Sequence, residues 1–307
     1  MGKKDSYIYV ILTSVVCFWG LNVVMVKYLS FFPPVVIAAI RMLIAAIVLT
    51  PILFVKKKEK CKLSVKQWLF IVAIGSTSIA LHQILLAWGL QHSTAGSSSL
   101  VLALNPLATT LLAALLLGEK LSIRKGMGIL LGFTGVIIAV TSKGDGHISF
   151  GLGEIIIFGS MLMYVAGGLF VRGAKSTGLP VWELTAYSQW IGAIILAVLS
   201  IGIYPTSIFQ EMNTSWFTWF VIFCSGGISS GLGSLGWNYG IQKIGASQTS
   251  IFLNGMPIAS LLFAAWLINE PLTYLAIVAL LCTITGVYLG STSRSVKIPV
   301  CNKSREV

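Results

Sequence analysis

Two stretches of the chain decide its fold, because they repeat one another. Residues Gly89 to Val136 read GLQHSTAGSSSLVLALNPLATTLLAALLLGEKLSIRKGMGILLGFTGV, and residues Gly240 to Val287 read GIQKIGASQTSIFLNGMPIASLLFAAWLINEPLTYLAIVALLCTITGV. Aligned without a gap at an offset of 151 residues, they share 17 identities in 48 positions. Chance in a chain of biased composition gives roughly one identity in ten. The chain therefore contains an internal duplication.

The composition around these stretches is that of a membrane protein. The 307 residues are 56% hydrophobic and 10% charged, and the mean hydropathy is +0.90. A soluble domain carries roughly a quarter charged residues, so this chain lacks the polar surface to cover itself in water. The net charge of +12 comes from short basic clusters between apolar runs. That distribution favours one face of a membrane protein and argues against nucleic acid as a partner.

The apolar runs predict an all-α membrane protein of ten transmembrane helices. About 20 apolar residues span a bilayer as a helix. The first run is charge-free over residues 6–26 and has no cleavage pattern after it, so we expect a retained helix rather than a signal peptide. The expected spans are residues 7–27, 34–55, 67–88, 97–117, 123–142, 153–171, 183–203, 216–237, 247–268 and 272–291.

The duplication divides these spans into two five-helix repeats. The first repeat is expected over residues 1–145 and the second over 151–292, followed by a cytoplasmic tail at 293–307. Because five is odd, the second repeat must enter the membrane from the opposite side. The prediction is two inverted repeats, a construction that recurs among secondary transporters because two inverted halves can open alternately to each side.

The basic residues predict the orientation of the chain. With the N-terminus inside, 18 of the 21 Lys and Arg residues fall on inner loops and termini, and only Lys27, Arg41 and Lys143 fall on the outer half. Cytoplasmic loops of membrane proteins carry the excess of Lys and Arg. We therefore expect a multi-pass protein of the cell membrane with both termini in the cytoplasm.

Several short motifs resemble one known family once per half of the chain. The first half carries Phe18-Trp19-Gly20-Leu21-Asn22, with Lys27 and Arg41 after it, then Asn105-Pro106, Leu117-Gly118-Glu119-Lys120-Leu121-Ser122 and Gly135; the second half carries Met256-Pro257, Asn269-Glu270-Pro271-Leu272-Thr273 and Gly286. With these motifs the chain resembles the EamA-type transporters of the drug/metabolite transporter superfamily.

The resemblance implies ten helices, a central cavity between the halves, and transport of amino acids, related metabolites or drugs, more often as export. The second half departs from the family pattern where Trp-Gly-Leu-Asn is replaced by Tyr164-Val165-Ala166-Gly167. The two halves are therefore expected to contribute unequally to substrate contacts. The partners implied are a small-molecule solute and the lipid bilayer.

Glu119 and Glu270 form a pair of equivalent acids, each at the end of a long apolar run. One interpretation is that they organise helix junctions beside the N-caps Ser122 and Thr273. The other is a gating or proton-carrying role. Pro106 and Pro257 occupy equivalent positions within helices four and nine, so they predict breaks at matching places in a core that moves.

Three ionisable residues lie within or near the ends of spans. Lys27 is expected either to reach the outer interface or to serve function, and Arg41, about seven residues inside its helix, to face an anion or to pair helices. His82, followed by Gln83, is the histidine deepest in a span. A neutral imidazole bonded between helices and a role in substrate contact or proton coupling are both open to it.

Polar and aromatic residues inside spans predict the substrate cavity, because lipid leaves amides unpaired. We expect a single central pocket lined by helices one, three, four, six, eight and nine. Helices five and ten should lie peripherally; Gly128/Gly132 and Gly286/Gly290 could pack them together or form a homodimer interface. The residues expected to line the pocket are Trp19, Asn22, His82, Gln83, Asn105, Tyr164, Trp237, Asn238 and Asn254.

The sequence carries no motif that indicates enzyme chemistry. It contains no P-loop and no HExxH, and its five cysteines show no metal-binding spacing. We therefore expect no metal and no cofactor. The prediction is a secondary transporter of small organic solutes. The alternatives are an intramembrane hydrolase that uses a serine with His82, and a membrane scaffold or sensor that transports nothing; the duplication favours transport, because alternating access explains two copies.

Overall fold

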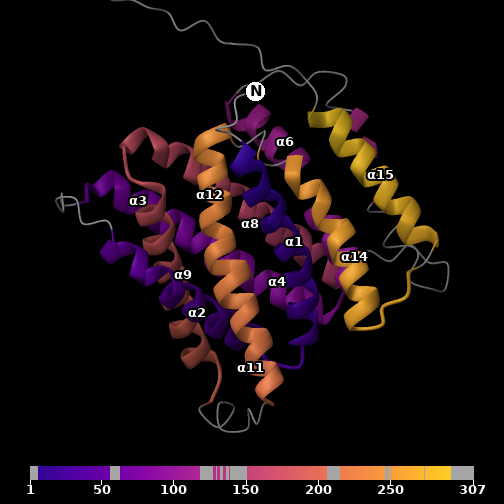
Figure 1. Ribbon diagram of the computed structural model, residues 1–307, viewed down its shortest axis with the longest axis horizontal. Helices are drawn as coiled ribbons and strands as arrows, with labels where there is room; N and C mark the ends of the chain where they lie inside the picture. Colours follow the sequence, from indigo (N-terminus) through magenta and orange to yellow (C-terminus); the bar gives the residue numbers. More distant parts are fainter. Residues whose placement is uncertain are drawn as a thin grey trace, which may run out of the picture.

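The computed structural model is a bundle of helices, with no strand among the residues it describes (Figure 1). It describes residues 6–55, 63–117, 127–128, 130–131, 134–135, 138, 151–205, 215–245, 249, 251–272 and 274–291. Six helices in these ranges are long and apolar enough to cross a membrane, and shorter apolar helices run over Phe252–Leu267 and Tyr274–Gly286. The prediction of an all-α membrane protein is confirmed. The number of ten crossings stays a prediction.

The first three candidate spans follow the expected ranges closely. Helix α1 covers Ser6–Tyr28 and α2 covers Pro34–Val55. The third span is continuous but irregular: α3 (Val65–Ile74) leads into a π-helical segment, η1 (Gly75–Leu81), and then into α4 (His82–Gln91). The α3 helix starts at a capping box, in which Ser64 and Gln67 each bond the other's backbone.

The middle of the chain has a matching irregularity. Helix α8 covers Leu152–Ala174, the short η2 covers Lys175–Thr177 and α9 covers Val181–Ile203. The next span consists of α11 (Trp216–Phe223), a second π-helical segment, η3 (Cys224–Leu232), and α12 (Gly233–Ile244). Gly226 and Leu232 lie 151 residues after Gly75 and Leu81, the first and last residues of η1. The two π segments therefore occupy equivalent positions of the repeat.

The spans that contain the two prolines both change their helical geometry near the proline. Helix α5 (Ala95–Leu102) ends before a turn at residues 103–104, and α6 (Asn105–Leu117) follows. In the second half, the short η4 (Ile251–Asn254) precedes α14 (Gly255–Leu267). Pro106 and Pro257 lie in the first turns of α6 and α14. Because proline has no N–H to donate to the preceding turn, it ends the upstream segment and starts the next helix without strain.

The last described helix, α15 (Tyr274–Ser291), packs at the edge of the bundle, on the right in Figure 1. Most of the expected fifth helix lies outside the described residues, but Gly135 belongs to it. A Cβ on Gly135 would lie 2.8 Å from the carbonyl oxygen of Ala279 in α15 and would also contact Thr283. Glycine therefore lets the fifth and last helices approach closely within one chain.

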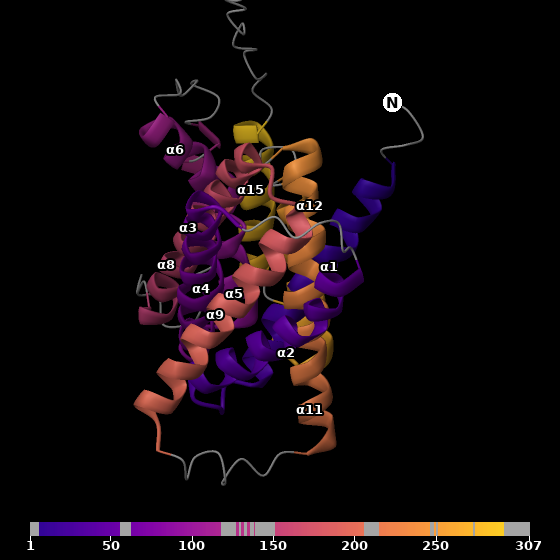
Figure 2. The ribbon, with the colours of Figure 1, turned by 90° about the vertical axis from the view of Figure 1, so that its left-hand side faces the viewer.

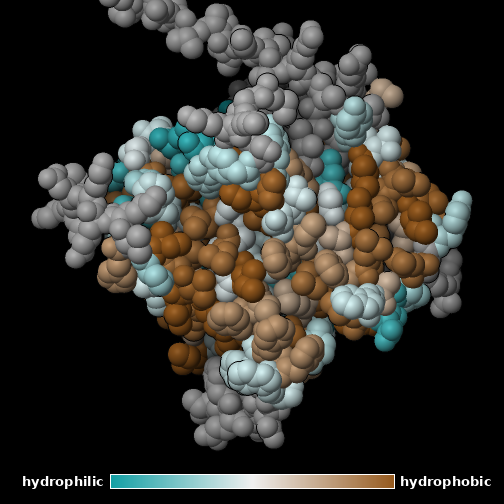
Figure 3. Space-filling model, viewed as in Figure 1, coloured by the Kyte–Doolittle hydropathy of each residue, from teal (hydrophilic) through white to brown (hydrophobic). Residues whose placement is uncertain are grey.

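The face of the bundle in Figure 3 is broadly apolar, and much of the polar surface on it lies near the ends of the bundle. Large side chains such as Phe54, Leu262 and Trp266 are 67%, 59% and 75% exposed. A soluble protein rarely exposes so much contiguous apolar surface, whereas lipid accommodates it. In Figure 2, which is turned by 90°, the last turns of α15 lie at the top of the bundle. The helices α9 and α11 extend to the bottom.

Candidate functional site

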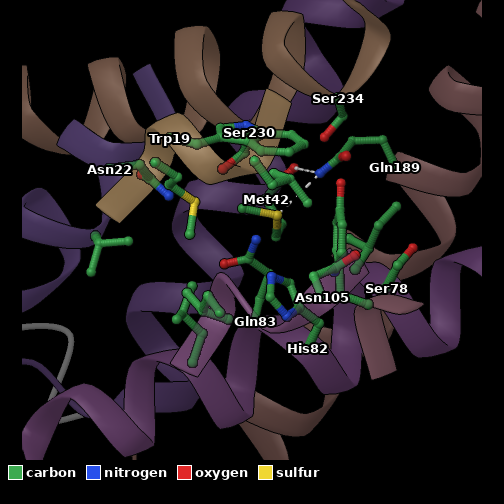
Figure 4. A pocket seen from close by; sticks show the side chains of 17 residues that line it. Trp19, Asn22, Met42, Ser78, His82, Gln83, Asn105, Gln189, Ser230 and Ser234 are labelled. Carbon is green, nitrogen blue, oxygen red and sulfur yellow. Dashed lines mark hydrogen bonds between the residues drawn. The ribbon is translucent and has the colours of Figure 1, made fainter. Parts of the chain in front are cut away.

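A cavity in the middle of the bundle gathers most of the polar side chains predicted for the substrate site (Figure 4). It offers about 70 Å³ to the centres of water-sized molecules, where about 10–15 Å³ accommodates one water. It can therefore hold several waters or a small solute. The lining residues are Trp19, Asn22, Val23, Met42, Ser78, Ile79, His82, Gln83, Leu86, Leu102, Asn105, Tyr164, Gln189, Ser230, Ser234, Leu253 and Met256.

Six of the nine residues expected to line the pocket do so: Trp19, Asn22, His82, Gln83, Asn105 and Tyr164. The other three lie outside this lining. Trp237 packs behind Trp19, with 4.9 Å between the ring centroids. Asn238 donates from Nδ2 to Thr185 Oγ1 at 3.0 Å. Asn254 ends η4, between two lining residues, and its Oδ1 is buried without a hydrogen bond from any described residue.

The wall also draws on two helices that were not expected to reach it. Met42 comes from α2 and Gln189 from α9. Gln189 donates from Nε2 to the Met42 sulfur at 3.2 Å and to the Met42 carbonyl oxygen at 3.5 Å, drawn as dashed lines in Figure 4. Since that nitrogen is engaged, the oxygen of Gln189 is the atom left to accept a hydrogen bond from a solute.

Trp19 and Tyr164, which occupy corresponding places in the two half-sequences, meet across the cavity. Their rings contact edge to face, with 5.8 Å between the centroids. The Trp19 indole nitrogen donates to the Ser229 carbonyl oxygen at 2.8 Å. Gly233 makes room for this ring, because a Cβ there would lie 2.8 Å from Nε1. The wall between the halves therefore has an aromatic surface fixed in one orientation.

His82 is held by Ser160 of α8. Its Nδ1 lies 3.0 Å from the Ser160 carbonyl oxygen and 2.8 Å from Ser160 Oγ, and Ser160 Oγ donates to the His82 carbonyl oxygen at 2.9 Å. A carbonyl oxygen can only accept, so Nδ1 carries the proton. In the neutral imidazole, Nε2 is then the acceptor. His82 therefore bonds to a neighbouring helix and also lines the cavity.

Arg41 lies directly behind the cavity wall and is fully buried. Its Nε donates to Ser225 Oγ at 2.6 Å, and Nη1 donates to Gln83 Oε1 at 3.3 Å. Its Nη2 donates to Asn22 Oδ1 at 3.1 Å and to Ser230 Oγ at 3.4 Å. No carboxylate of a described residue pairs with it. One cation thus joins α1, α2, α4 and η3 through neutral acceptors.

Lys27 lies at the end of the bundle where α4 turns into α5. Its Nζ donates to the carbonyl oxygens of Leu90 and Ser93 at 2.9 and 2.7 Å. A cation at the C-terminal end of a helix stabilises the last carbonyls and the helix dipole. The same turn is fixed from α8, because Ser93 Oγ donates to the buried Glu154 carboxylate at 2.7 Å. Lys27 therefore has a defined binding partner in α4 rather than only an interfacial position.

Glu270 bonds across the halves of the chain. Its carboxylate accepts from the backbone N–H groups of Ala95 and Gly96, the first residues of α5. Asn269 precedes it with φ of 52°, a left-handed conformation that Asn adopts more readily than most residues. Glu119, Ser122 and Thr273 lie outside the described residues. The gating or helix-junction role of the two acids stays a prediction.

The described residues contain no group of three or more His, Cys, Asp or Glu side chains placed to hold a metal. The small-residue pairs of the fifth and last helices are only partly described: Gly128 and Gly286 are buried, and Gly132 and Gly290 are outside the described side chains. A homodimer through these helices stays a prediction.

Each half of the chain, on either side of the cavity, matches the same protein family. The sequence pattern of the EamA-like transporter family matches residues 6–141 and again residues 151–292. The chain belongs to the EamA-like transporter family. Members of this family are transporters and not enzymes, and the prediction that this chain is not an enzyme is confirmed.

Two relatives match this EamA-like chain over nearly its whole length, and a third matches about two thirds or more of it. An uncharacterized transporter of Bacillus subtilis, YyaM, is 29% identical, with 99% of both chains covered. A probable amino-acid metabolite efflux pump of Escherichia coli is 26% identical over 94% of this chain and 95% of its own. A probable terminal-alkyne amino-acid exporter of Streptantibioticus cattleyicolor is 25% identical over 71% of each chain.

The fold is also found in a crystal structure. One solved chain superposes with a TM-score of 0.67 at 16% identity, covering 92% of this chain and 95% of that chain. At 16% identity, the similarity is evidence for the fold only.

Sequence reasoning missed part of the EamA-like cavity wall. Gln189 is an amide within a span, as Asn22 and Asn105 are. Ser78, Ser230 and Ser234 lie in or beside glycine-rich or serine-rich π segments. Serine within a span is common in helix packing, so it gave little signal. The π segments themselves, which often mark functional sites, have no sequence signature that could be recognised beforehand.

Proposed function

We propose that this protein is a secondary transporter that moves small organic solutes, with amino acids and related metabolites as the favoured class, by alternating access. The observation that carries the proposal is the composition of the cavity wall. Four pairs of lining residues are separated by 151 positions in the sequence, the offset of the duplication: Ile79 and Ser230, Gln83 and Ser234, Leu102 and Leu253, and Asn105 and Met256.

Because equivalent positions of the two halves line it, the cavity is shared by both halves. If the halves are inverted, as the odd number of expected spans requires, a rocking motion of one against the other exposes the same cavity to each side in turn. The matched π segments and the matched changes of helix geometry near the prolines support this interpretation, because they lie at equivalent positions of the duplicated sequence.

The chemistry of the wall suits a small zwitterion. Asn22, Gln83 and Asn105 offer amide groups, while the Gln189 oxygen and His82 Nε2 offer acceptors. The aromatic faces of Trp19 and Tyr164 attract cations. The printed names of two relatives, an amino-acid exporter and an amino-acid metabolite efflux pump, favour amino-acid-like solutes and export from the cell.

A hydrolase that pairs a serine with His82 is not supported by the site. Ser160 Oγ does lie 2.8 Å from His82 Nδ1, but Nδ1 donates its proton to a carbonyl oxygen and cannot serve as a base. The Ser160 hydroxyl donates to the His82 backbone and is not part of the cavity lining. The pair therefore positions the imidazole.

Flux through purified protein tests the proposal. The protein is reconstituted in liposomes loaded with unlabelled amino acids, and counterflow of each radiolabelled amino acid is measured against protein-free liposomes. We expect uptake of at least one neutral amino acid, saturable and abolished by Trp19→Ala. In parallel, cells that overexpress the protein should release that solute into the medium faster than cells that lack it. Absence of counterflow for the whole set would contradict the proposal.

A further inference from the structure

The amide orientations around Arg41 create a surface of hydrogen-bond donors on one side of the cavity. The guanidinium group of Arg41 can only donate, so an amide that bonds to it must present its oxygen to it. Asn22 Oδ1 and Gln83 Oε1 both face Arg41, at 3.1 and 3.3 Å. Their nitrogen atoms must therefore point away from Arg41.

Serine hydroxyls complete this arrangement. Ser225 Oγ accepts from Arg41 Nε and donates its own proton to Asn22 Oδ1 at 2.5 Å. Ser230 Oγ accepts from Arg41 Nη2 and donates to the Ser225 carbonyl oxygen at 2.9 Å. Asn22 Oδ1 thus receives two hydrogen bonds and has no lone pair left for a solute. Rotation of the Asn22 amide would place its NH₂ group against two donors, so the network locks its orientation.

The two amide nitrogens turned away from Arg41 face the cavity. Neither Asn22 Nδ2 nor Gln83 Nε2 bonds to a described residue, although both side chains are more than nine-tenths buried, at 7% and 8% exposure. Figure 4 shows the blue nitrogen atoms of both side chains on the side of the space that the labelled residues enclose. Buried N–H groups without a partner cost free energy, so they require water or a solute as acceptor.

The positive charge of Arg41, behind these donors, also favours a negatively charged group in the cavity. Arg41 is fully buried in the span and is neutralised by no carboxylate of a described residue. In a medium of low dielectric constant its field extends into the adjacent cavity and favours negative charge there. Gly226 allows this geometry, since a Cβ would lie 2.5 Å from the Arg41 carbonyl oxygen and would separate η3 from α2.

We infer that Asn22 and Gln83 form a carboxylate subsite in which their NH₂ groups bind the two oxygens of the solute, while Arg41 orients both amides and supplies the positive charge. Arg41 is a positioning residue, because it does not line the cavity. The inference rests on the proposed function for the nature of the solute, and it adds which group of the solute is recognised and where.

The experiment compares solutes that differ in one group. Leucine, leucinamide, 3-methylbutylamine and 4-methylpentanoate present both groups, an amide in place of the carboxylate, the amine alone and the carboxylate alone. Equivalent sets built on alanine and on phenylalanine ensure that side-chain size does not decide the result. Binding is measured by calorimetry on purified full-length protein, and flux is measured separately in proteoliposomes.

The decisive variant is Asn22→Asp. It has the same shape and keeps an oxygen for Arg41, with which it forms an ion pair, but it replaces the cavity-facing NH₂ group by an oxygen that repels a carboxylate. We expect the affinity ratio of leucine to 3-methylbutylamine to fall by about tenfold or more. Gln83→Glu should act in the same direction. Arg41→Lys keeps the charge but cannot hold both amides, and it should lower the same ratio while 3-methylbutylamine still binds.

The matched control is Asn238→Asp, the same chemical change in a span but outside the cavity lining. It should leave the ratio unchanged. Equal losses for acid and amine in Asn22→Asp, or a wild-type protein that binds none of the carboxylates, would overturn the subsite. If amines are transported and acids do not bind, the subsite is wrong and the transport function stands. If acids bind with the expected preference and nothing is transported, the subsite stands and the proposed function fails.

Discussion

The Glu270 carboxylate accepts a 2.9 Å hydrogen bond from the backbone N–H of Ala95, although the two residues lie 175 positions apart in the chain. The other carboxylate oxygen accepts from Gly96 at 3.2 Å, and Thr94 Oγ1 accepts from the N–H of Ser97 at 3.1 Å. The first three N–H groups of α5 are therefore satisfied, two of them by a residue of the second half. A carboxylate at this place also stabilises the positive end of the helix dipole.

The Glu270→Gln variant should loosen this end of α5. An amide offers one oxygen and turns its NH₂ group toward the second N–H, so one hydrogen bond and the charge are lost, at a cost of about 1–2 kcal/mol. Hydrogen–deuterium exchange of the peptide that contains Ala95 and Gly96 should accelerate several-fold. The control is Glu183→Gln, which removes a carboxylate from the first turn of its own helix, α9. Unchanged exchange in the α5 peptide would show that Glu270 does not hold the helix.

The role of Glu270 illustrates what the sequence could and could not predict. Its place at the end of an apolar run predicted a helix-junction role, and the structure has it at a helix N-terminus. The helix is α5 of the other half, not the one that follows it, and only the three-dimensional fold brings residues 175 positions apart into contact. Gly118 precedes Glu119 as Asn269 precedes Glu270, so residues suited to a left-handed turn recur in both halves.

The cavity, too, could be predicted from the sequence only in part. The lengths of the apolar runs predicted the six long spans found among the described residues, because hydrocarbon thickness sets helix length. The cost of unpaired amides in lipid predicted Asn22, Gln83 and Asn105 in the wall. Asn238 also fits that criterion, but it bonds to Thr185 instead. An amide in a span can be satisfied by a neighbouring helix or by a solute, and composition does not distinguish the two.

Close packing of α2 against η3 should depend on Gly226. In Gly226→Ala, the added Cβ would lie 2.5 Å from the Arg41 carbonyl oxygen. Because this oxygen belongs to the backbone of α2, it cannot move aside as a flexible side chain could. We expect a loss of stability of about 1–3 kcal/mol, measured as a lower midpoint of thermal unfolding in detergent. Gly168→Ala is the matched control, because nothing lies within 4 Å of its Cβ position. It should be neutral or stabilise by up to about 1 kcal/mol. Equal midpoints for the two variants would contradict the proposed contact.

Thiol labelling tests which serines face the cavity. In a background in which the five native cysteines are replaced, Ser78→Cys and Ser234→Cys should react with N-ethylmaleimide, and a transported solute should slow the reaction, because both positions line the cavity. Ser188→Cys serves as the control, since Ser188 is fully buried and outside the lining. The cavity would be wrongly placed if Ser234→Cys reacted no faster than Ser188→Cys.

The orientation of the chain can be tested from its C-terminus. The basic residues predict both termini in the cytoplasm. Figures 1 and 2 both place the first turns of α1 and the last turns of α15 at the same end of the bundle, which requires an even number of crossings. A green fluorescent protein fused after Val307 should fluoresce, and alkaline phosphatase at the same place should be inactive, because each folds on one side of the membrane only. Truncated after residue 210, between α9 and α11, the chain should give the opposite pair of results. An active phosphatase after Val307 would contradict a cytoplasmic C-terminus, and with an even number of crossings it would place both termini outside the cell.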